Sequence, residues 1–446
     1  MKHSFSDNDK KAMLAGGISR RQFLQLSALT GFGIITGCAA NPVTGQRELM
    51  LMSQAQEISI DRENSPHQIS ADYGTSRDKQ LSAYVADVGQ TIVRNSHRPE
   101  MPYAFHTLNA PYVNAYAFPG GTIGVTRGIL LDMKNEAELA SLLGHEAGHV
   151  AARHTSQRMT RGLIASAVLS GAAVTAGSQM GDLVAGLGGI GAGALLAGYS
   201  RNQEREADSL GLEYMVKSDY NPEGFIGLMN MLNEMSGKNE SSMAVLFSTH
   251  PMSSERYKTA LKEVDTVYAD QKRTRSVYRE RYMDNTAELR KIGPAIKAMQ
   301  DGDREMMRKN PEKAREHYER ALKVAPEDYA GNLKMAKCHL ALKNHQDANR
   351  FAQKARAVYP EEHQSKHVLG MTNLQLKKFD QALAMFNDYE KALPGNPNIS
   401  FFQGFSLEGM GRKEESARKY HAYLQKVNQG DYAKHAYTRL EEWGYI

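Results

Sequence analysis

The chain has 446 residues, of which 41% are hydrophobic and 24% charged, a composition typical of a globular protein with two or three domains. Most of the formal net charge of +5 lies at the amino terminus, because residues 1–37 hold five basic and two acidic side chains. The rest of the chain is close to neutral and gives no support for nucleic-acid binding. Two cysteines, Cys38 and Cys338, do not predict a disulfide framework.

The first 38 residues are predicted to be an export signal rather than part of the fold. Arg20 and Arg21, followed by Phe-Leu, resemble a twin-arginine signal, and the apolar run of about a dozen residues is too short to span a bilayer. Ile35-Thr-Gly-Cys38 resembles a bacterial lipobox, so Cys38 is the expected lipidation site. Ala39 points to the outer membrane by the same resemblance. A soluble signal peptide that contains a cysteine is the alternative.

A turn-rich tether is expected over 39–52, and residues 53–270 are predicted to form one α+β domain. Apolar side chains recur at helical spacing over 53–72 and 78–95. The period then changes to that of short strands, which predicts a small antiparallel sheet from Tyr103–Leu108, Val113–Phe118 and Thr122–Thr126.

The edge strand of this sheet is expected over Asn114–Phe118. Such an edge could pair with an extended peptide, which makes Asn114 and Tyr116 candidate substrate-binding residues. Ordinary sheet packing is the alternative for both.

A His-Glu-x-x-His pattern follows the sheet, within a stretch that has helical spacing. His145 and His149 are four residues apart on one helix face, so both imidazoles can bind one Zn²⁺ ion. Glu146 is rotated by about 100° from His145, which suits a carboxylate that reaches the metal-bound water. An amphipathic helix with two incidental histidines is the alternative. His154 does not share this face and is expected to be structural, behind the site or at a cap.

Residues 162–200 carry only one charged side chain, Asp182, and are rich in glycine. Two apolar arms here could form a transmembrane hairpin, but each arm is marginal for a span and glycine weakens a helix. We expect a mobile apolar lid or a membrane-contacting hairpin over the active site.

An acidic helix signature comes next, with Glu204, Glu206 and Asp208. Glu204 and Asp208 are four residues apart and face the same way. Glu204 can supply the third protein ligand that a catalytic zinc site needs, and Asp208 can accept the free N–H of a liganding histidine. A solvated charged face is the alternative, and Glu206 is expected to be exposed.

His145-Glu-Ala-Gly-His149, followed 55 residues later by Glu204 and then Asp208, resembles the gluzincin metalloproteases that include HtpX and the periplasmic β-barrel assembly-enhancing protease, BepA. Asn41-Pro-Val-Thr-Gly is similar to lipoprotein members of that family. The resemblance implies one Zn²⁺ per chain, held by His145, His149 and Glu204, with Glu146 as the general base.

The same resemblance extends to Phe247-Ser-Thr-His250-Pro251. It implies that His250 approaches the zinc as a fourth ligand or plug that keeps the enzyme latent. A turn-forming His-Pro without metal contact is the alternative.

Small residues and prolines recur every 34 residues in the last third of the chain, as at Pro326, Pro360, Pro394 and at Gly302, Ala336, Gly370, Gly404. This period predicts an α-solenoid of four tetratricopeptide helix pairs over 293–446, with a capping helix within Asp431–Tyr445. Residues 271–292 are expected to be a linker helix. The repeats could hold a partner protein or pack on the protease domain.

The predicted class is therefore mainly α, with an α+β zincin-like metalloprotease domain followed by repeats. The resemblance implies a lipid-anchored periplasmic endopeptidase that degrades misassembled outer-membrane proteins and assists their assembly. Its repeats would hold those proteins or their assembly machinery, and the lid and His250 would gate access. The alternative is a chaperone-like repeat adaptor with a latent metal site.

Overall fold

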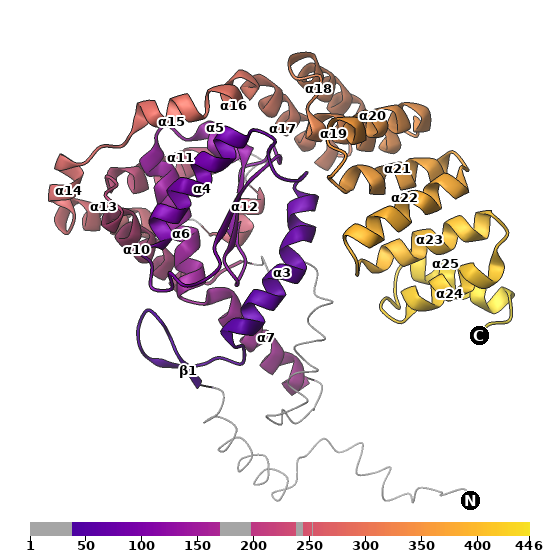
Figure 1. Ribbon diagram of the computed structural model, residues 1–446, viewed down its shortest axis with the longest axis horizontal. Helices are drawn as coiled ribbons and strands as arrows, with labels where there is room; N and C mark the ends of the chain where they lie inside the picture. Colours follow the sequence, from indigo (N-terminus) through magenta and orange to yellow (C-terminus); the bar gives the residue numbers. More distant parts are fainter. Residues whose placement is uncertain (1–37, 170–197, 238–243, 252) are drawn as a thin grey trace, which may run out of the picture.

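The computed structural model describes residues 38–169, 198–237, 244–251 and 253–446 (Figure 1). The predicted export signal and most of the predicted lid lie outside these ranges. Within them, none of the helices has both the length and the apolar character needed to cross a membrane. In the predicted protease domain the elements are β1 (Cys38–Ala40), β2 (Arg47–Leu49), α3 (Gln54–Ala71), α4 (Lys79–Val93), β3 (Ala104–Leu108), β4 (Ala115–Ala117), β5 (Thr122–Thr126), α5 (Arg127–Asp132), α6 (Glu136–Ala151), α7 (His154–Leu169), α10 (Arg201–Lys217), α11 (Glu223–Gly237), α12 (Ala244–Thr249) and α13 (Ser254–Thr266).

The predicted antiparallel sheet is wrong in one respect, because the sheet is mixed. Its order is β3-β5-β4, with β3 parallel to β5 and β4 antiparallel to β5. Because β5 lies between β3 and β4, these two strands are not neighbours in the sheet. The short connection between β3 and β4 is therefore not a hairpin. The predicted bounds of β5 are confirmed, whereas β3 begins one residue later than predicted and β4 covers only three of the six residues predicted for it. The edge position of β4 is confirmed.

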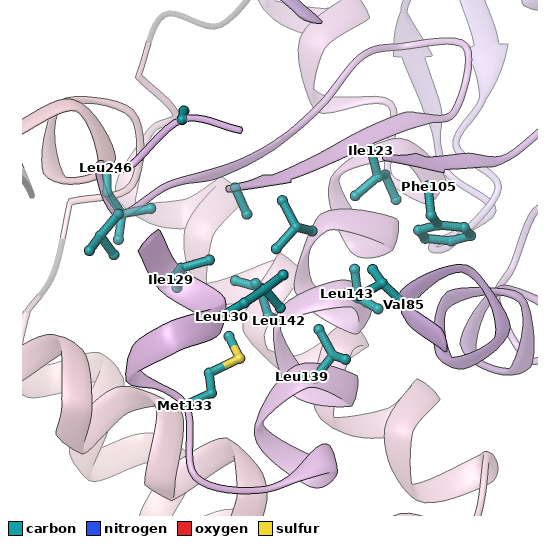
Figure 2. Packing of buried hydrophobic residues seen from close by; sticks show 14 of the residues in the cluster. Val85, Phe105, Ile123, Ile129, Leu130, Met133, Leu139, Leu142, Leu143 and Leu246 are labelled. Carbon is teal, nitrogen blue, oxygen red and sulfur yellow. The ribbon is translucent and has the colours of Figure 1, made fainter. Parts of the chain in front are cut away.

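Helix α6 lies at the centre of the protease domain, and all its residues are buried. Figure 2 shows Leu139, Leu142 and Leu143 of this helix packed among side chains that include Val85 of α4 and Leu130 of α5. Because the helix is buried on all sides, no face of it is exposed to solvent. The same burial removes the side chains of His145 and His149 from water.

Both ends of α6 are held by buried polar contacts. At the first turn, the Glu136 carboxylate accepts hydrogen bonds from the hydroxyls of Tyr84 and Tyr220 at 2.9 and 2.8 Å. At the last turn, Arg98 donates to the carbonyl of Val150 at 3.1 Å. Because both termini are tied to other elements, the helix cannot slide along its axis without breaking buried hydrogen bonds.

The predicted single linker helix is wrong. The chain forms α14 (Ala269–Thr274), α15 (Arg279–Asn285) and α16 (Ala287–Lys291), and Tyr278 between the first two adopts a left-handed φ of 53°. Side chains from these short helices bind protease backbone, as where the Tyr282 hydroxyl donates to the Leu130 carbonyl at 2.6 Å. A straight helix could not follow the domain surface and make these contacts.

The predicted four helix pairs and the capping helix are confirmed. They are α17 (Gly293–Met307), α18 (Pro311–Val324), α19 (Tyr329–Ala341), α20 (His345–Val358), α21 (Gln364–Gln375), α22 (Phe379–Ala392), α23 (Pro397–Gly409), α24 (Lys413–Leu424) and α25 (Asp431–Glu442). The turn inside each pair uses one left-handed residue, at Lys309, Lys343, Lys377 and Gly411, again 34 residues apart. At each turn the backbone closes the first helix with a Schellman hydrogen-bond pair.

The repeats extend along one side of the protease domain, and α3 faces them (Figure 1). Arg127 of α5 forms a two-pronged ion pair with Asp328 at the start of α19, and both side chains are only 6% exposed. At the end of α3, the Ser70 hydroxyl donates to Glu362 of the α20–α21 turn. We call these two pairs the docking contact. It places the protease and the repeats in one packed body.

Candidate metal centre

Four donor side chains from three segments meet at the carboxyl half of α6. His145 and His149 come from α6, Glu204 from the first turn of α10, and His250 from the residue after α12. Their facing nitrogen and oxygen atoms are separated by 3.0 to 3.7 Å, the shortest being His250 Nδ1 to Glu204 Oε1. The helical placement of three of these residues was predicted from the sequence, and the structure brings all four together.

The donor set fits zinc. Two or three imidazoles with one carboxylate are typical zinc ligands, and bonds of about 2.0–2.1 Å in a tetrahedron require donor atoms roughly 3.3 Å apart. The observed separations lie around this value. Burial also lowers the pKa of His149 well below its usual range, which keeps the imidazole neutral as a ligand must be.

Glu146 lies beside this cluster without joining it. Its Oε1 is 3.7 Å from Nε2 of His250, and its Oε2 is buried with no hydrogen-bond partner among the described residues. Burial raises the pKa of this carboxyl. A buried, unsatisfied carboxylate oxygen with a raised pKa is poised to take a proton from a group that enters the site.

His145 is oriented from behind by Asp208, as predicted. The Nδ1 of His145 lies 3.0 Å from Asp208 Oδ1, so a proton on Nδ1 leaves Nε2 free for the metal. Arg256 of α13 was not predicted. It contacts both oxygens of Asp208 at 2.6 Å and Glu204 Oε2 at 2.6 Å. No spacing signal links Arg256 to the motif, because it comes from a separate helix.

Arg256 also bears on the charge balance around Glu204. Burial disfavours the ionised form, but the surrounding histidines, His250 first, hold the pKa of Glu204 below its usual range, so the carboxylate is ionised. The single positive charge of Arg256 offsets only one of the two negative charges on Glu204 and Asp208. The remaining negative charge favours a bound cation.

His149 is oriented by a second relay. Its Nδ1 lies 2.8 Å from Nδ1 of His154, whose Nε2 lies 3.2 Å from the Glu206 carboxylate. Because an ionised carboxylate only accepts, His154 carries its proton on Nε2 and accepts from His149 Nδ1. The Nε2 of His149 is then left for the metal. His154 stands behind the site as expected, but the prediction for Glu206 is wrong, since its side chain is 31% exposed and bonded.

Helices α6 and α10 touch through glycine. A Cβ added to Gly144 would lie 2.8 Å from the carbonyl oxygen of Gly211, and one added to Gly211 would lie 2.7 Å from the backbone nitrogen of His145. We call this the glycine contact. It brings the backbone of the histidine helix against that of the Glu204 helix and so sets the distance between their ligands.

The remaining predicted residues lie elsewhere. Asn114 and Tyr116 are buried, neither belongs to the donor cluster, and the Tyr116 hydroxyl donates to Asp72 at 2.8 Å. Peptide pairing at the β4 edge stays a prediction. Cys38 begins β1, and its lipidation also stays a prediction.

Comparison with known families agrees with this geometry. Residues 79–264 match the model of peptidase family M48, and residues 305–372 match a tetratricopeptide repeat model. The chain carries a peptidase family M48 domain. The M48 match covers α4 to α13 and therefore includes all four donors, Glu146 and Arg256.

Two curated relatives share this region. The beta-barrel assembly-enhancing protease of Yersinia pestis is 28% identical over 225 residues, which are 47% of this chain and 45% of that protein. Metalloprotease YcaL of Escherichia coli is 27% identical over 243 residues, 52% of this chain and 93% of that protein. The chain thus spans about half the length of the first relative and nearly all of the second.

Among solved structures, MamA of Desulfovibrio magneticus covers 34% of this chain with 16% identity and a TM-score of 0.32. A score this low supports no inference about function.

Proposed function

We propose that the protein is a zinc-dependent endopeptidase whose active site is the M48 metal centre. The observation that carries this proposal is the position of Glu146, a buried carboxylate with an unsatisfied oxygen beside four converging metal donors. A purely structural zinc site has no need of such a group.

The chemistry follows from the residues present. Zinc bound by His145, His149 and Glu204 would polarise a scissile carbonyl and acidify a water molecule. Glu146 takes the proton of the attacking water and passes it to the leaving amine. Asp208 and the His154–Glu206 pair keep the two histidines in the required tautomers, and Arg256 holds Glu204 and Asp208 in place.

His250 is proposed to hold the site latent. A catalytic zinc site keeps one position open, whereas here a fourth protein donor stands within 3.3 Å of His145 Nε2. Substrate must therefore displace His250. The lid proposed over 162–200 would add a further gate.

The test uses Glu146→Gln and Glu204→Ala in the full chain. Removal of the general base is expected to lower casein hydrolysis by about 10²–10⁴-fold without loss of zinc. Glu204→Ala is expected to lose stoichiometric zinc as well as activity. Retention of activity by Glu146→Gln, or of full zinc affinity by Glu204→Ala, would contradict the proposal.

For substrates and location, we propose a lipid-anchored enzyme of the bacterial envelope that degrades misassembled outer-membrane proteins and assists their assembly, with the repeats as the holder. The lipobox resemblance at Cys38 and the similarity to the beta-barrel assembly-enhancing protease of Yersinia pestis support this. Cys38→Ser should release the protein from the membrane fraction, and continued retention would refute the anchor.

A chaperone-like adaptor remains the second candidate, favoured by the occupied fourth donor position of His250. In that case Glu146→Gln would support envelope function as fully as the wild type, and only changes in the repeats would impair it.

A further inference from the structure

An apolar pocket opens directly beside the general base. Its walls are Leu142 of α6, the α11 residues Phe225, Leu228, Met229 and Leu232, and Leu246 of α12. Its rim is formed by the polar side chains of the metal centre, including Glu146 and His145. Any group seated in this pocket would therefore lie next to the reacting atoms.

The space left in the pocket is about 40 Å³. That volume holds a few water molecules at most, and apolar walls offer water few hydrogen bonds. Apolar walls favour an apolar side chain, and Leu246 supplies the wall on the α12 side.

Leu246 and His250 enter the site together. The amide of His250 donates to the carbonyl of Leu246 at 2.7 Å, so the two residues are one helical turn apart on one face. Leu246 is 4% exposed and is the only buried residue among those α12 side chains whose placement is described. Figure 2 shows it at the edge of the core cluster that contains Leu142. One turn of chain thus places a leucine in the pocket wall and an imidazole among the metal donors.

We propose that this pocket binds the side chain of a substrate residue flanking the scissile bond, with preference for leucine, methionine or phenylalanine, and that Leu246 occupies the place of that side chain when the site is latent. The inference rests on the proposed endopeptidase function and adds its substrate class. Segments rich in such residues are buried in folded proteins and exposed in unfolded ones. The pocket would therefore direct cleavage to unfolded polypeptide.

The first test measures binding without turnover. In a Glu146→Gln background, zinc-loaded and metal-free, the affinity for a fluorescent peptide with a central leucine is compared with that for its aspartate counterpart. Leu246→Ala is expected to tighten binding of the leucine peptide about 10-fold or more and to leave the aspartate peptide weak. Equal gains for both peptides, or no gain for either, would overturn the proposal.

The second test maps cleavage sites in unfolded casein by mass spectrometry. Leu246→Ala is expected to raise kcat/KM several-fold at sites next to leucine, and Met229→Ala should shift the preference towards phenylalanine by enlarging the pocket. Leu289→Ala is the matched control, because Leu289 is equally buried but lies on α16, away from the pocket.

The two proposals fail in different ways. Cleavage by the wild type and all variants with no apolar bias would refute the pocket and leave the endopeptidase standing. Leucine-selective binding with no cleavage by any variant would refute the endopeptidase.

Discussion

The glycine contact and the docking contact join large parts of this molecule, and they are built from opposite kinds of residue. Between α6 and α10, backbone meets backbone because Gly144 and Gly211 have no side chains to separate them. Between the protease and the repeats, charged and polar side chains reach across, as in Arg127–Asp328 and Ser70–Glu362.

The difference concerns what each contact can tolerate. Backbone has no rotamers, so a displacement of α10 moves Glu204 relative to His145 by a similar distance. Side chains can reorient, and a polar contact instead depends on charge pairing in a buried setting. The glycine contact should therefore control metal geometry, and the docking contact should control the placement and stability of the repeats.

The largest effect is expected from Arg127→Met. It leaves Asp328 buried without its partner, which should destabilise the start of α19 by about 3–5 kcal/mol. Hydrogen exchange of α19 amides measures this local opening free energy. Asp328→Asn in addition should recover part of the loss, because asparagine can still cap α19. An unchanged opening free energy, or a weakened zinc affinity, would break the proposed division between the two contacts.

The next effect is expected from Gly211→Ala. The added Cβ would lie 2.7 Å from the backbone nitrogen of His145, so the helices must move apart. Overpacking should cost about 1–3 kcal/mol, and we expect zinc affinity to fall about 10–100-fold. Competition with a chelator measures the affinity.

Gly331→Ala in α19 is the matched control for Gly211→Ala. Its Cβ would meet the flexible end of Leu322 at 3.1 Å rather than backbone, and zinc affinity should not change. Equal zinc affinities of Gly211→Ala and the wild type would contradict the role of the glycine contact.

The smallest effect is expected from Glu362→Gln. Burial raises the pKa of Glu362 above its ordinary value of 4.5, so the folded protein holds this proton more tightly than the unfolded chain. The resulting stabilisation is complete below that ordinary value and is lost as pH rises through the raised pKa.

Chemical denaturation of both proteins at several pH values measures this contribution. The advantage of the wild type over Glu362→Gln should shrink with rising pH, by at most about 1.4 kcal/mol per pH unit. A wild-type advantage that grows with rising pH would contradict the raised pKa of Glu362. A change in zinc affinity in Glu362→Gln would contradict the separate roles of the docking contact and the glycine contact.

The helices and the repeats could be predicted because their signals are local. His145 and His149 lie one turn apart in the sequence itself, and the period of 34 repeats the same helix pair. The structure shows why the period tolerates variation. Gly302, Gly370 and Gly404 each face the aromatic ring of the paired helix, at Tyr318, Phe386 and Tyr420. In the second repeat, Ala336 stands where the other repeats have glycine, and Ala352 stands where they have an aromatic residue. The extra Cβ of Ala336 is thus matched by the smaller side chain of Ala352.

The contacts between distant segments could not be predicted in the same way. The parallel pairing of β3 with β5, the break at Tyr278 and the approach of Arg256 to Glu204 all depend on which elements become neighbours. Glu206 shows the limit most clearly, because its sequence context is that of a solvated face, yet it ends the relay behind His149.

The sequence by itself determined the pairing of His145 with His149, the place of Glu146 between them and the repeat architecture, because each depends on spacing along one helix or one period. Only the tertiary structure decided what surrounds them: the glycine contact between α6 and α10, the guanidinium beside two buried carboxylates, and the leucine that lines the pocket beside Glu146. These features arise where segments far apart in the chain share one buried volume, and packing in that volume decides which side chains meet.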